Sequence, residues 1–285
     1  MNKIEVAVLR ESSCNPAGIM MFLAKLTQRG HCIKNMDDLM QLYRNTLGNY
    51  RSETVKSIAA LPHGTIKRFT PITVAVVGAS RRFLAQARTH QVGFNYVSAS
   101  LQYSNYSGEA DFVVPYALLE AEAAGKKFGP YCDMGDPEHK LSVYLSPVEK
   151  YLEGCKLAMN NYEDIASMTD NDTAGYAAPQ GLRNILIMQA NHEAWMNFIR
   201  LRACNRNTTE TQYVTLRIWE ALLNTYDGEE MLYYAGPDCM YGVCREGKGC
   251  CKKPMKNLAE RAHSMGISVP SLIIKEKWPL LEASK

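Results

Sequence analysis

Residues 78–104 hold a dense set of arginine, amide and hydroxyl side chains, which are the groups that bind polar rings and phosphates. Ser80 can cap a helix of about residues 80–91. On such a helix Gln86 and His90 are one turn apart and share a face. The hydroxyls and amides that follow this helix could hold a polar ring. An amphipathic helix with a solvated basic end is the competing interpretation, and the residues alone leave both open.

A second segment, residues 191–210, combines aromatic and arginine side chains at helical spacing. Four of its residues fall on one stripe at about 100° per residue, namely Asn191, Trp195, Phe198 and Arg202. A stripe with polar ends and an aromatic centre suits a planar ligand with polar edges. The alternative is a core stripe of the two aromatic side chains, with arginines reaching out to solvent at its end.

Arg206 lies one turn beyond Arg202, so the two guanidinium groups could converge. A guanidinium binds phosphate through paired donors, or it polarises a carbonyl oxygen. The pair therefore indicates recognition of an anion or activation of a polar ring.

Four of the nine cysteines gather in a glycine-rich loop, namely Cys239, Cys244, Cys250 and Cys251. Closely spaced thiolates can surround a tetrahedral zinc ion. The spacing is not that of a standard zinc knuckle and no histidine lies nearby, so we expect no metal and keep zinc as the alternative. In either case the cluster is expected to stabilise the tail and to be dispensable for the chemistry.

The elements that must position these segments mix strands and helices. Strands are predicted at about residues 3–9, 66–77, 182–189 and 268–274, and helices at about 15–28, 36–46, 53–60, 80–91, 110–125, 139–168 (broken near 147), 191–204, 208–225 and 254–265. Because they do not alternate strictly, the pattern favours an α+β fold, a mixed sheet with flanking helices. No glycine-rich dinucleotide fingerprint follows a strand.

Composition narrows the classes of protein. The net charge of +3 over 285 residues does not by itself indicate nucleic acid, and we expect no nucleic-acid partner. No stretch approaches the roughly 20 apolar residues that span a bilayer. The first residues lack the apolar core of a secretory signal. We therefore expect a cytoplasmic protein with no membrane partner.

Read in order, the segments resemble the flavin-dependent thymidylate synthases. The family signature places Arg-His-Arg after a helix that opens with Ser-Arg and carries a Gln, and a Ser and an Arg-Tyr pair follow. The corresponding positions here are Ser80, Arg81, Gln86, Thr89, His90, Gln91, Ser100, Gln102 and Tyr103. Upstream, His63-Gly64-Thr65 resembles the family's His-Glu-Ser/Thr.

The resemblance continues downstream. Asn191, Asn197-Phe198 and Leu201–Arg206 resemble the family's Asn-Ala-Arg…Asn-Phe…Leu-Arg helix, and the cysteine-rich tail resembles those of some bacterial members. The match covers most of residues 60–252, and its strength lies in the order of the segments. It implies a single catalytic domain over residues 1–235, with a cysteine-rich extension over 236–285 packed on it.

The resemblance implies reductive methylation of dUMP to dTMP, with methylenetetrahydrofolate and NADPH as co-substrates and FAD as the cofactor. It also implies a homotetramer whose sites form where subunits meet. Arg202 is the expected catalytic residue, polarising the uracil ring. The expected substrate-binding residues are Gln86, Arg88, Ser100, Gln102, Tyr103, Arg183 and Arg202. The expected cofactor-binding residues are His63, Thr65, Thr89, His90, Gln91, Asn95, Asn191, Asn197 and Arg206.

Several arginines of the family pattern are replaced. The changed positions are Thr89, Gln91, Gln102, Gly175 and Glu193, of which Gly175 stands in the family's Ala-Arg-x-x-x-Pro element. Arg88, Arg183 and Arg206 are the expected substitutes. The alternatives are a relative that acts on another pyrimidine nucleotide, and a flavin- or nucleotide-binding protein without catalysis.

Overall fold

The computed structural model describes residues 4–10, 15–108, 110–132, 142–241 and 244–252. The chain divides into two compact units. Unit 1 comprises Met1–Glu5, Val77–Ala87 and Ser98–Leu186, and unit 2 comprises Val6–Val76, Arg88–Val97 and Ile187–Lys285. Each unit is built from chain segments that are distant in sequence.

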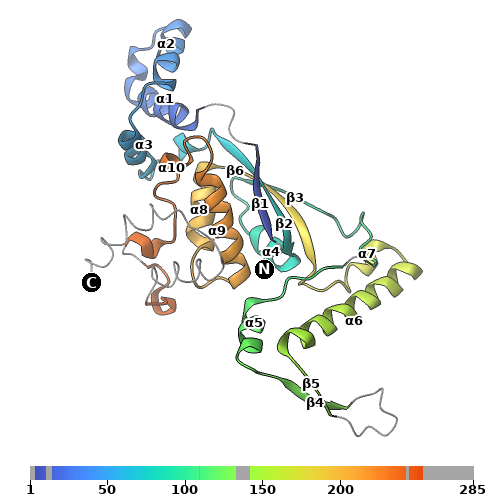
Figure 1. The fold of residues 1–285 in the computed structure, drawn as a ribbon. Coiled ribbons are helices and arrows are strands. Elements are labelled where there is room, and N and C mark those ends of the chain that lie inside the picture. The colour runs from blue at the N-terminus through green and yellow to red at the C-terminus, as the bar shows by residue number, and fades with distance from the viewer. Residues whose placement is uncertain (1–3, 11–14, 109, 133–141, 242–243, 253–285) are drawn as a thin grey trace. The chain divides into compact units, whose positions relative to one another are not determined.

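A four-stranded sheet has the strand order β1-β2-β6-β3 (Figure 1). Its strands are β1 (Glu5–Arg10), β2 (Pro71–Ser80), β3 (Phe94–Ser98) and β6 (Arg183–Asn191). Alternate residues of β6 are buried from Asn184 to Ala190, as expected when one face of a strand meets a core. Pro71 is the first residue of β2, where a missing N–H is tolerated.

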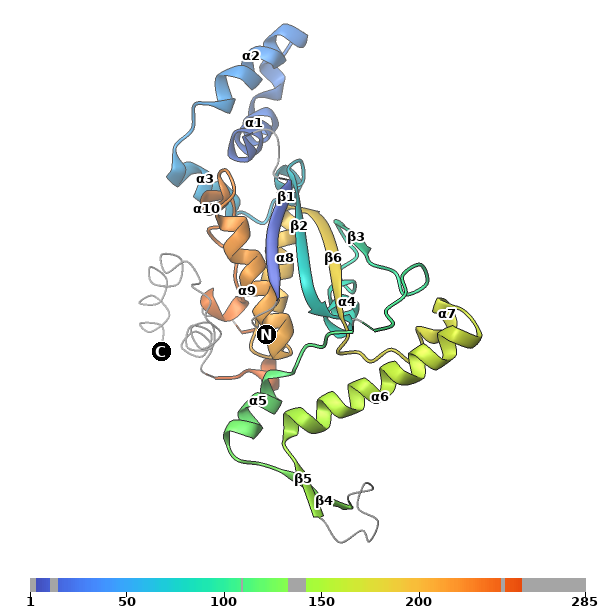
Figure 2. The same ribbon diagram turned by 45° about the vertical axis from the view of Figure 1, so that its right-hand side comes forward.

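Unit 2 holds most of the helices. They are α1 (Pro16–Arg29), α2 (Met36–Leu47), α3 (Ser52–Ala59), α8 (His192–Arg202), α9 (Thr209–Leu223) and α10 (Gly228–Met231), with the short 3-10 turns η1 (Gly30–Cys32), η2 (Gly64–Lys67), η3 (Asp238–Tyr241) and η4 (Gly247–Gly249). Helices α8 and α9 lie side by side in both views (Figures 1 and 2). Trp195 on α8 and Trp219 on α9 are among the fully buried side chains of unit 2.

Unit 1 contains α4 (Arg81–Ala87), α5 (Tyr116–Ala123), the antiparallel hairpin of β4 (Phe128–Cys132) and β5 (Ser142–Leu145), α6 (Pro147–Met168) and α7 (Asn171–Ala174) (Figure 2). A capping box of Ser146 and Glu149 begins α6, with Pro147 in its first turn. A core of Met159, Tyr162 and Leu182 joins α6 to the chain that precedes β6.

The structure confirms the α+β class and corrects three predicted elements. The helix predicted for residues 139–168 begins only at Pro147, because Ser142–Leu145 pairs with β4 as a strand. The helix predicted for residues 110–125 is the shorter α5. Helix α4 ends at Ala87, so Gln86 and His90 do not share a helical face. The helix and strand predicted for residues 254–274 lie outside the described residues.

Within the described ranges, every helix is either too short or too polar to cross a membrane.

Candidate functional site

Arg202, on the last turn of α8, is held by three side chains of unit 2. Its Nε donates to His90 Nε2 at 2.7 Å, and its NH2 group donates to Thr89 Oγ1 at 2.7 Å. Its NH1 group donates to Asn207 Oδ1 at 3.1 Å. A planar guanidinium held at three points has a fixed orientation, which is what directional recognition of a ligand requires.

These contacts explain why α4 stops at Ala87. Thr89 and His90 leave the helical path and turn their side chains to Arg202. Burial, and then the charge of Arg202, lower the pKa of His90 to about 4. The imidazole is therefore neutral at physiological pH and accepts at Nε2. Tyr96 fixes the same segment, because its hydroxyl donates to the His90 carbonyl at 2.8 Å.

The aromatic centre of the α8 stripe belongs to the core. Trp195 and Phe198 are completely buried, and both pack against the ring of Phe94. They cannot stack on a ligand, so the expectation of an aromatic ligand platform is wrong. Asn191 is the N-cap of α8, where its side-chain oxygen accepts from the Ala194 N–H at 2.9 Å. Of the stripe, only the polar ends at Asn191 and Arg202 remain for chemistry.

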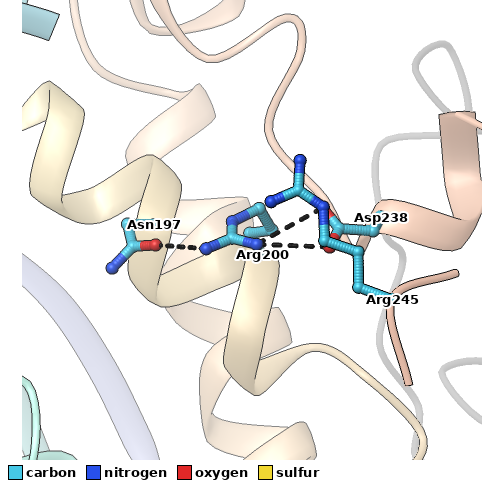
Figure 3. A network of polar contacts seen from close by, with 4 residues as sticks. All are labelled: Asn197, Arg200, Asp238 and Arg245. Atoms are coloured by element: carbon cyan, nitrogen blue, oxygen red, sulfur yellow. Dashed lines mark hydrogen bonds and ion pairs between the residues drawn. The ribbon is translucent and has the colours of Figure 1, made fainter. Parts of the chain in front are cut away.

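A cavity of about 520 Å³ lies within unit 2. It is lined by Ala59, Ala60, Leu61, Pro62, Lys67, Glu193, Met196, Asn197, Arg200, Tyr234, Gly236, Asp238 and Arg245. Figure 3 shows the polar network on the wall of the cavity. Asn197 Oδ1 accepts a hydrogen bond from Arg200 at 2.8 Å. The Asp238 carboxylate forms ion pairs with Arg200 at 3.2 Å and with Arg245 at 3.4 Å. With two arginines to one carboxylate, this network carries a net positive charge.

Two departures from the family pattern, Gly64 and Glu193, meet at Glu193 on the wall of this cavity. A Cβ atom at Gly64 would lie 2.8 Å from the carboxylate of Glu193, so a larger residue there would have to displace that side chain. Glu193 in turn pairs with the buried Lys67 at 2.9 Å. The ammonium also donates to the carbonyls of Ala59 and Leu61. At two positions where the family pattern has Glu and Arg, this chain therefore has Gly64 and Glu193 side by side, with Lys67 as the cation beside Glu193.

The other cofactor candidates of unit 2 are exposed. His63 and Thr65 flank Gly64 at the start of η2. Asn95, on β3, donates to Gln189 at 3.3 Å, and Gln91 lies in the chain that leads to β3. Arg206 lies beneath η4 of the tail, where a Cβ at Gly249 would be 3.6 Å from its guanidinium. Arg88, the substrate-side candidate of unit 2, is also exposed.

In unit 1, Arg183 is engaged by its own chain. Its NH1 group donates to the Gly78 carbonyl at 2.7 Å, and its Nε forms an ion pair with Asp111 at 3.2 Å. Only 14% of the side chain is exposed. A phosphate would have to compete with the Asp111 carboxylate for this guanidinium.

A second arginine of unit 1 was not among the predicted site residues. Arg81 donates to the carbonyls of Gly175 at 3.4 Å and Ala178 at 3.0 Å. Burial lowers its pKa. The loop that carries an arginine in the family pattern therefore receives one from α4 instead.

The remaining substrate-side candidates of unit 1 lie in or near the turn after β3. Ser100 Oγ accepts from the Gln102 N–H at 3.1 Å. Tyr103 is 83% exposed and Gln102 is exposed, while Gln86 on α4 is half-buried. Leu101 lies against Gly175, since a Cβ atom added at Gly175 would be 3.3 Å from the Cβ atom of Leu101.

Sequence reasoning missed Lys67, Arg200, Asp238 and Arg245. Lys67 precedes a strand and carries no motif. Arg200 lies on α8 beside the stripe that drew attention, and the two tail residues become neighbours of α8 only in the folded chain.

The model of the thymidylate synthase complementing protein family matches residues 9–226. The chain belongs to this family. Among curated proteins, none matches the chain in sequence. The prediction of the family, made from the order of degenerate segments, is confirmed.

Solved structures share the fold of this family member at low identity. Thymidylate synthase X from Helicobacter pylori with FAD and dUMP has a TM-score of 0.54 and 16% identity, covering 80% of this chain and 96% of that one. A second structure of the Helicobacter pylori enzyme, complexed with FAD and dUMP, has a TM-score of 0.53 and 18% identity, covering 81% of this chain and 99% of that one. The UMP/dUMP methylase PolB from Streptomyces cacaoi, bound with 5-Br dUMP, has a TM-score of 0.56 and 15% identity, covering 82% of this chain and 96% of that one.

Proposed function

We propose that the chain is a flavin-dependent thymidylate synthase that converts dUMP to dTMP, with methylenetetrahydrofolate and NADPH as co-substrates. Membership of the family over residues 9–226 supports the class of reaction. The observation that carries the proposal within the chain is Arg202, a guanidinium fixed by neutral acceptors on Thr89, His90 and Asn207.

Arg202 is the proposed catalytic residue. Methylation of a uracil ring requires negative charge to develop on that ring before its C5 can react. A fixed cationic donor that faces the pyrimidine stabilises this charge without having to reorganise. The neutral His90 contributes orientation, because its Nε2 accepts from Arg202 and does not repel it.

The polar groups of unit 2 fit a nucleotide cofactor. The cavity of about 520 Å³ holds an amide on Asn197 and guanidinium groups on Arg200 and Arg245. Amides suit the polar edge of a flavin ring, and guanidinium groups suit its diphosphate. FAD, when bound, supplies the redox chemistry and the one-carbon transfer. The proposed holders on this chain are Arg200 and Arg245, together with His63, Thr65, Thr89, His90, Gln91, Asn95, Asn191, Asn197 and Arg206.

The proposed nucleotide contacts are Gln86, Arg88, Ser100, Gln102, Tyr103 and Arg183, with Arg202 at the ring. Ser100 serves as a binding group, since the proposed chemistry needs no protein nucleophile. The active form is a homotetramer in the cytoplasm, as the resemblance implies, with sites at subunit boundaries.

Absorption spectroscopy tests the flavin part of the proposal. Purified protein should be yellow, or become yellow with added FAD, and NADPH should bleach it. Light scattering should give a tetramer. A colourless monomer in excess FAD would contradict both. Complementation of a thymidine-requiring strain then tests the complete reaction.

A second candidate is methylation of another pyrimidine nucleotide. It is favoured by the loss of arginines at positions 102 and 175, which in the family pattern contact the nucleotide. The fold is also shared with a protein described as a UMP/dUMP methylase. Parallel assays with dUMP and UMP distinguish the two candidates, since only the first predicts strong preference for dUMP.

A further inference from the structure

Four cysteines of unit 2 converge on one small cavity. Its volume is about 10 Å³, room for roughly one water-sized sphere. It is lined by Ala203, Cys204, Asn205, Arg206, Pro237, Cys239, Cys244, Glu246 and Cys251. Cys204 comes from the turn that follows α8, and the other three thiols come from the tail around η3 and η4. The convergence is therefore made by folding and is not a property of one loop.

The thiols of this cluster influence one another. All four thiols line the same cavity, and Glu246 lines it as well. Without a cation, several thiolates cannot coexist in so small a volume. A divalent ion at the centre would reverse this, because it stabilises the thiolate form of each ligand.

We propose that Cys204, Cys239, Cys244 and Cys251 bind one zinc ion, which fastens the tail to the end of α8. Four thiolates around zinc form a closed tetrahedral site, the arrangement of structural rather than catalytic zinc. Each thiol releases its proton to solvent as its sulfur binds the ion, and no electron is transferred.

The four proposed ligands differ in one cysteine from the four that are close together in the sequence. Cys250 adjoins Cys251 in the chain but does not line the cavity. Its sulfur accepts from the Lys252 N–H at 3.4 Å, and its thiol is hydrogen-bonded to that of Cys244. Cys204 replaces it as the fourth ligand.

The ion has to draw the sulfur atoms together. Within the described residues, no group of three or more histidine, cysteine or acidic side chains is already arranged to hold a metal. Thiol side chains reach such an arrangement by rotation, and metal binding commonly completes the ordering of its own site.

The ion would also support the Arg202 site at a distance. Asn207, which accepts from Arg202, donates to the carbonyl of Cys204 at 3.2 Å and to that of Leu201 at 2.7 Å. Fixing Cys204 therefore fixes the loop that orients Arg202. The metal acts through position and does not touch the substrate.

The test uses the full chain, reduced, stripped with a chelator and titrated with Zn²⁺ alone. We expect about one zinc ion per chain after gel filtration. Cys204→Ser and Cys239→Ser should weaken zinc binding by more than about 100-fold, since each removes a ligand and not merely its support. Cys155→Ser, which removes the buried thiol of α6, is the matched control and should bind zinc as the wild type does.

Cobalt reports on the ligand set. Co²⁺ in the wild type should show tetrahedral visible bands and sulfur-to-cobalt charge transfer. Cys250→Ser should leave this spectrum unchanged, whereas Cys251→Ser should reduce its charge-transfer intensity. Equal zinc retention in Cys204→Ser and the wild type, or a cobalt spectrum without charge transfer, overturns the proposal.

A measurement on the wild type guards against variants that fail to fold. Zinc added to the stripped chain should raise the melting temperature, because it binds the folded tail in preference to the unfolded one. An unchanged melting temperature counts against the site. None of these readouts depends on flavin or nucleotide chemistry.

Discussion

Arg202 in unit 2 and Arg183 in unit 1 are both partly buried and both held by their own chain, yet their partners differ in charge. The acceptors described around Arg202 are an imidazole, a hydroxyl and an amide, which carry no negative charge. Arg183 faces the carboxylate of Asp111. Neutral acceptors orient a guanidinium without neutralising its charge, whereas a carboxylate neutralises it. The partner therefore tells more about an arginine's role than its burial does.

Replacing Arg202 should have the largest effect. Arg202→Ala should lower dTMP formation by roughly 100- to 1000-fold, the usual effect of removing a donor that stabilises developing charge. Reduction of the flavin by NADPH should remain close to wild type. Single-turnover kinetics measures both steps.

Arg217→Ala is the matched control, since Arg217 pairs with Glu220 on the adjacent helix α9. Turnover of Arg202→Ala at the rate of this control would remove Arg202 from the mechanism and, with it, the contrast between the two arginines.

Acid should affect unit 2 more than unit 1. Burial lowers the pKa of the completely buried His192 to about 4, and His90 beside Arg202 has a similarly lowered pKa. The unfolded chain binds protons at these histidines below about pH 6.5 while the folded chain does not, so stability is lost as pH falls from 6.5 towards 4. For His192 the loss is on the order of 3 kcal/mol.

Hydrogen exchange at pH 7 and pH 4.5 measures this loss in each unit separately. His31→Gln, at an exposed histidine of unit 2, is the control and should keep the acid sensitivity. His192→Gln should reduce it. Equal loss of protection in both units would show that these histidines do not govern the acid response.

Replacing Arg183 tests most directly whether its pairing with a carboxylate keeps it from binding the nucleotide. If it holds the nucleotide phosphate, Arg183→Ala should weaken dUMP binding about ten-fold or more, which is about 1.4 kcal/mol, and affect deoxyuridine far less. Calorimetric titration of both ligands measures the difference. Asp111→Asn is the companion variant, because it keeps the shape and removes the competing charge. It should tighten dUMP binding.

Unchanged dUMP affinity in Arg183→Ala, together with a lower melting temperature, would mean that Arg183 serves only to join Gly78 and Asp111. The phosphate would then be held by other residues.

Thr89 should show the smallest effect. Thr89→Val keeps the shape and removes one acceptor of Arg202, a contact worth about 1 kcal/mol, so turnover should fall roughly five- to ten-fold. Thr54→Val, at an exposed threonine on α3 of unit 2, controls for the loss of a hydroxyl. A Thr89→Val enzyme as active as the wild type would show that His90 and Asn207 suffice to orient Arg202.

The sequence predicted elements well where the signal is local. The helix that begins after Asn15 was found from a capping residue followed by proline, and Asn15 does accept from the Gly18 N–H. Ser80 likewise caps α4. The hairpin of β4 and β5 was missed because pairing between two short strands is not local, and each strand alone resembles part of a longer pattern.

Residue types and their order determined the family and the α+β class, and they drew attention to Arg202. Only the tertiary structure decided what each polar residue does. It ended α4 at Ala87 so that His90 could meet Arg202, and it placed Glu193 against Gly64. The physical reason is that a side chain's charge and freedom depend on its neighbours in space, and those neighbours can be distant in the sequence, as Thr89 and Arg202 are at 113 residues apart.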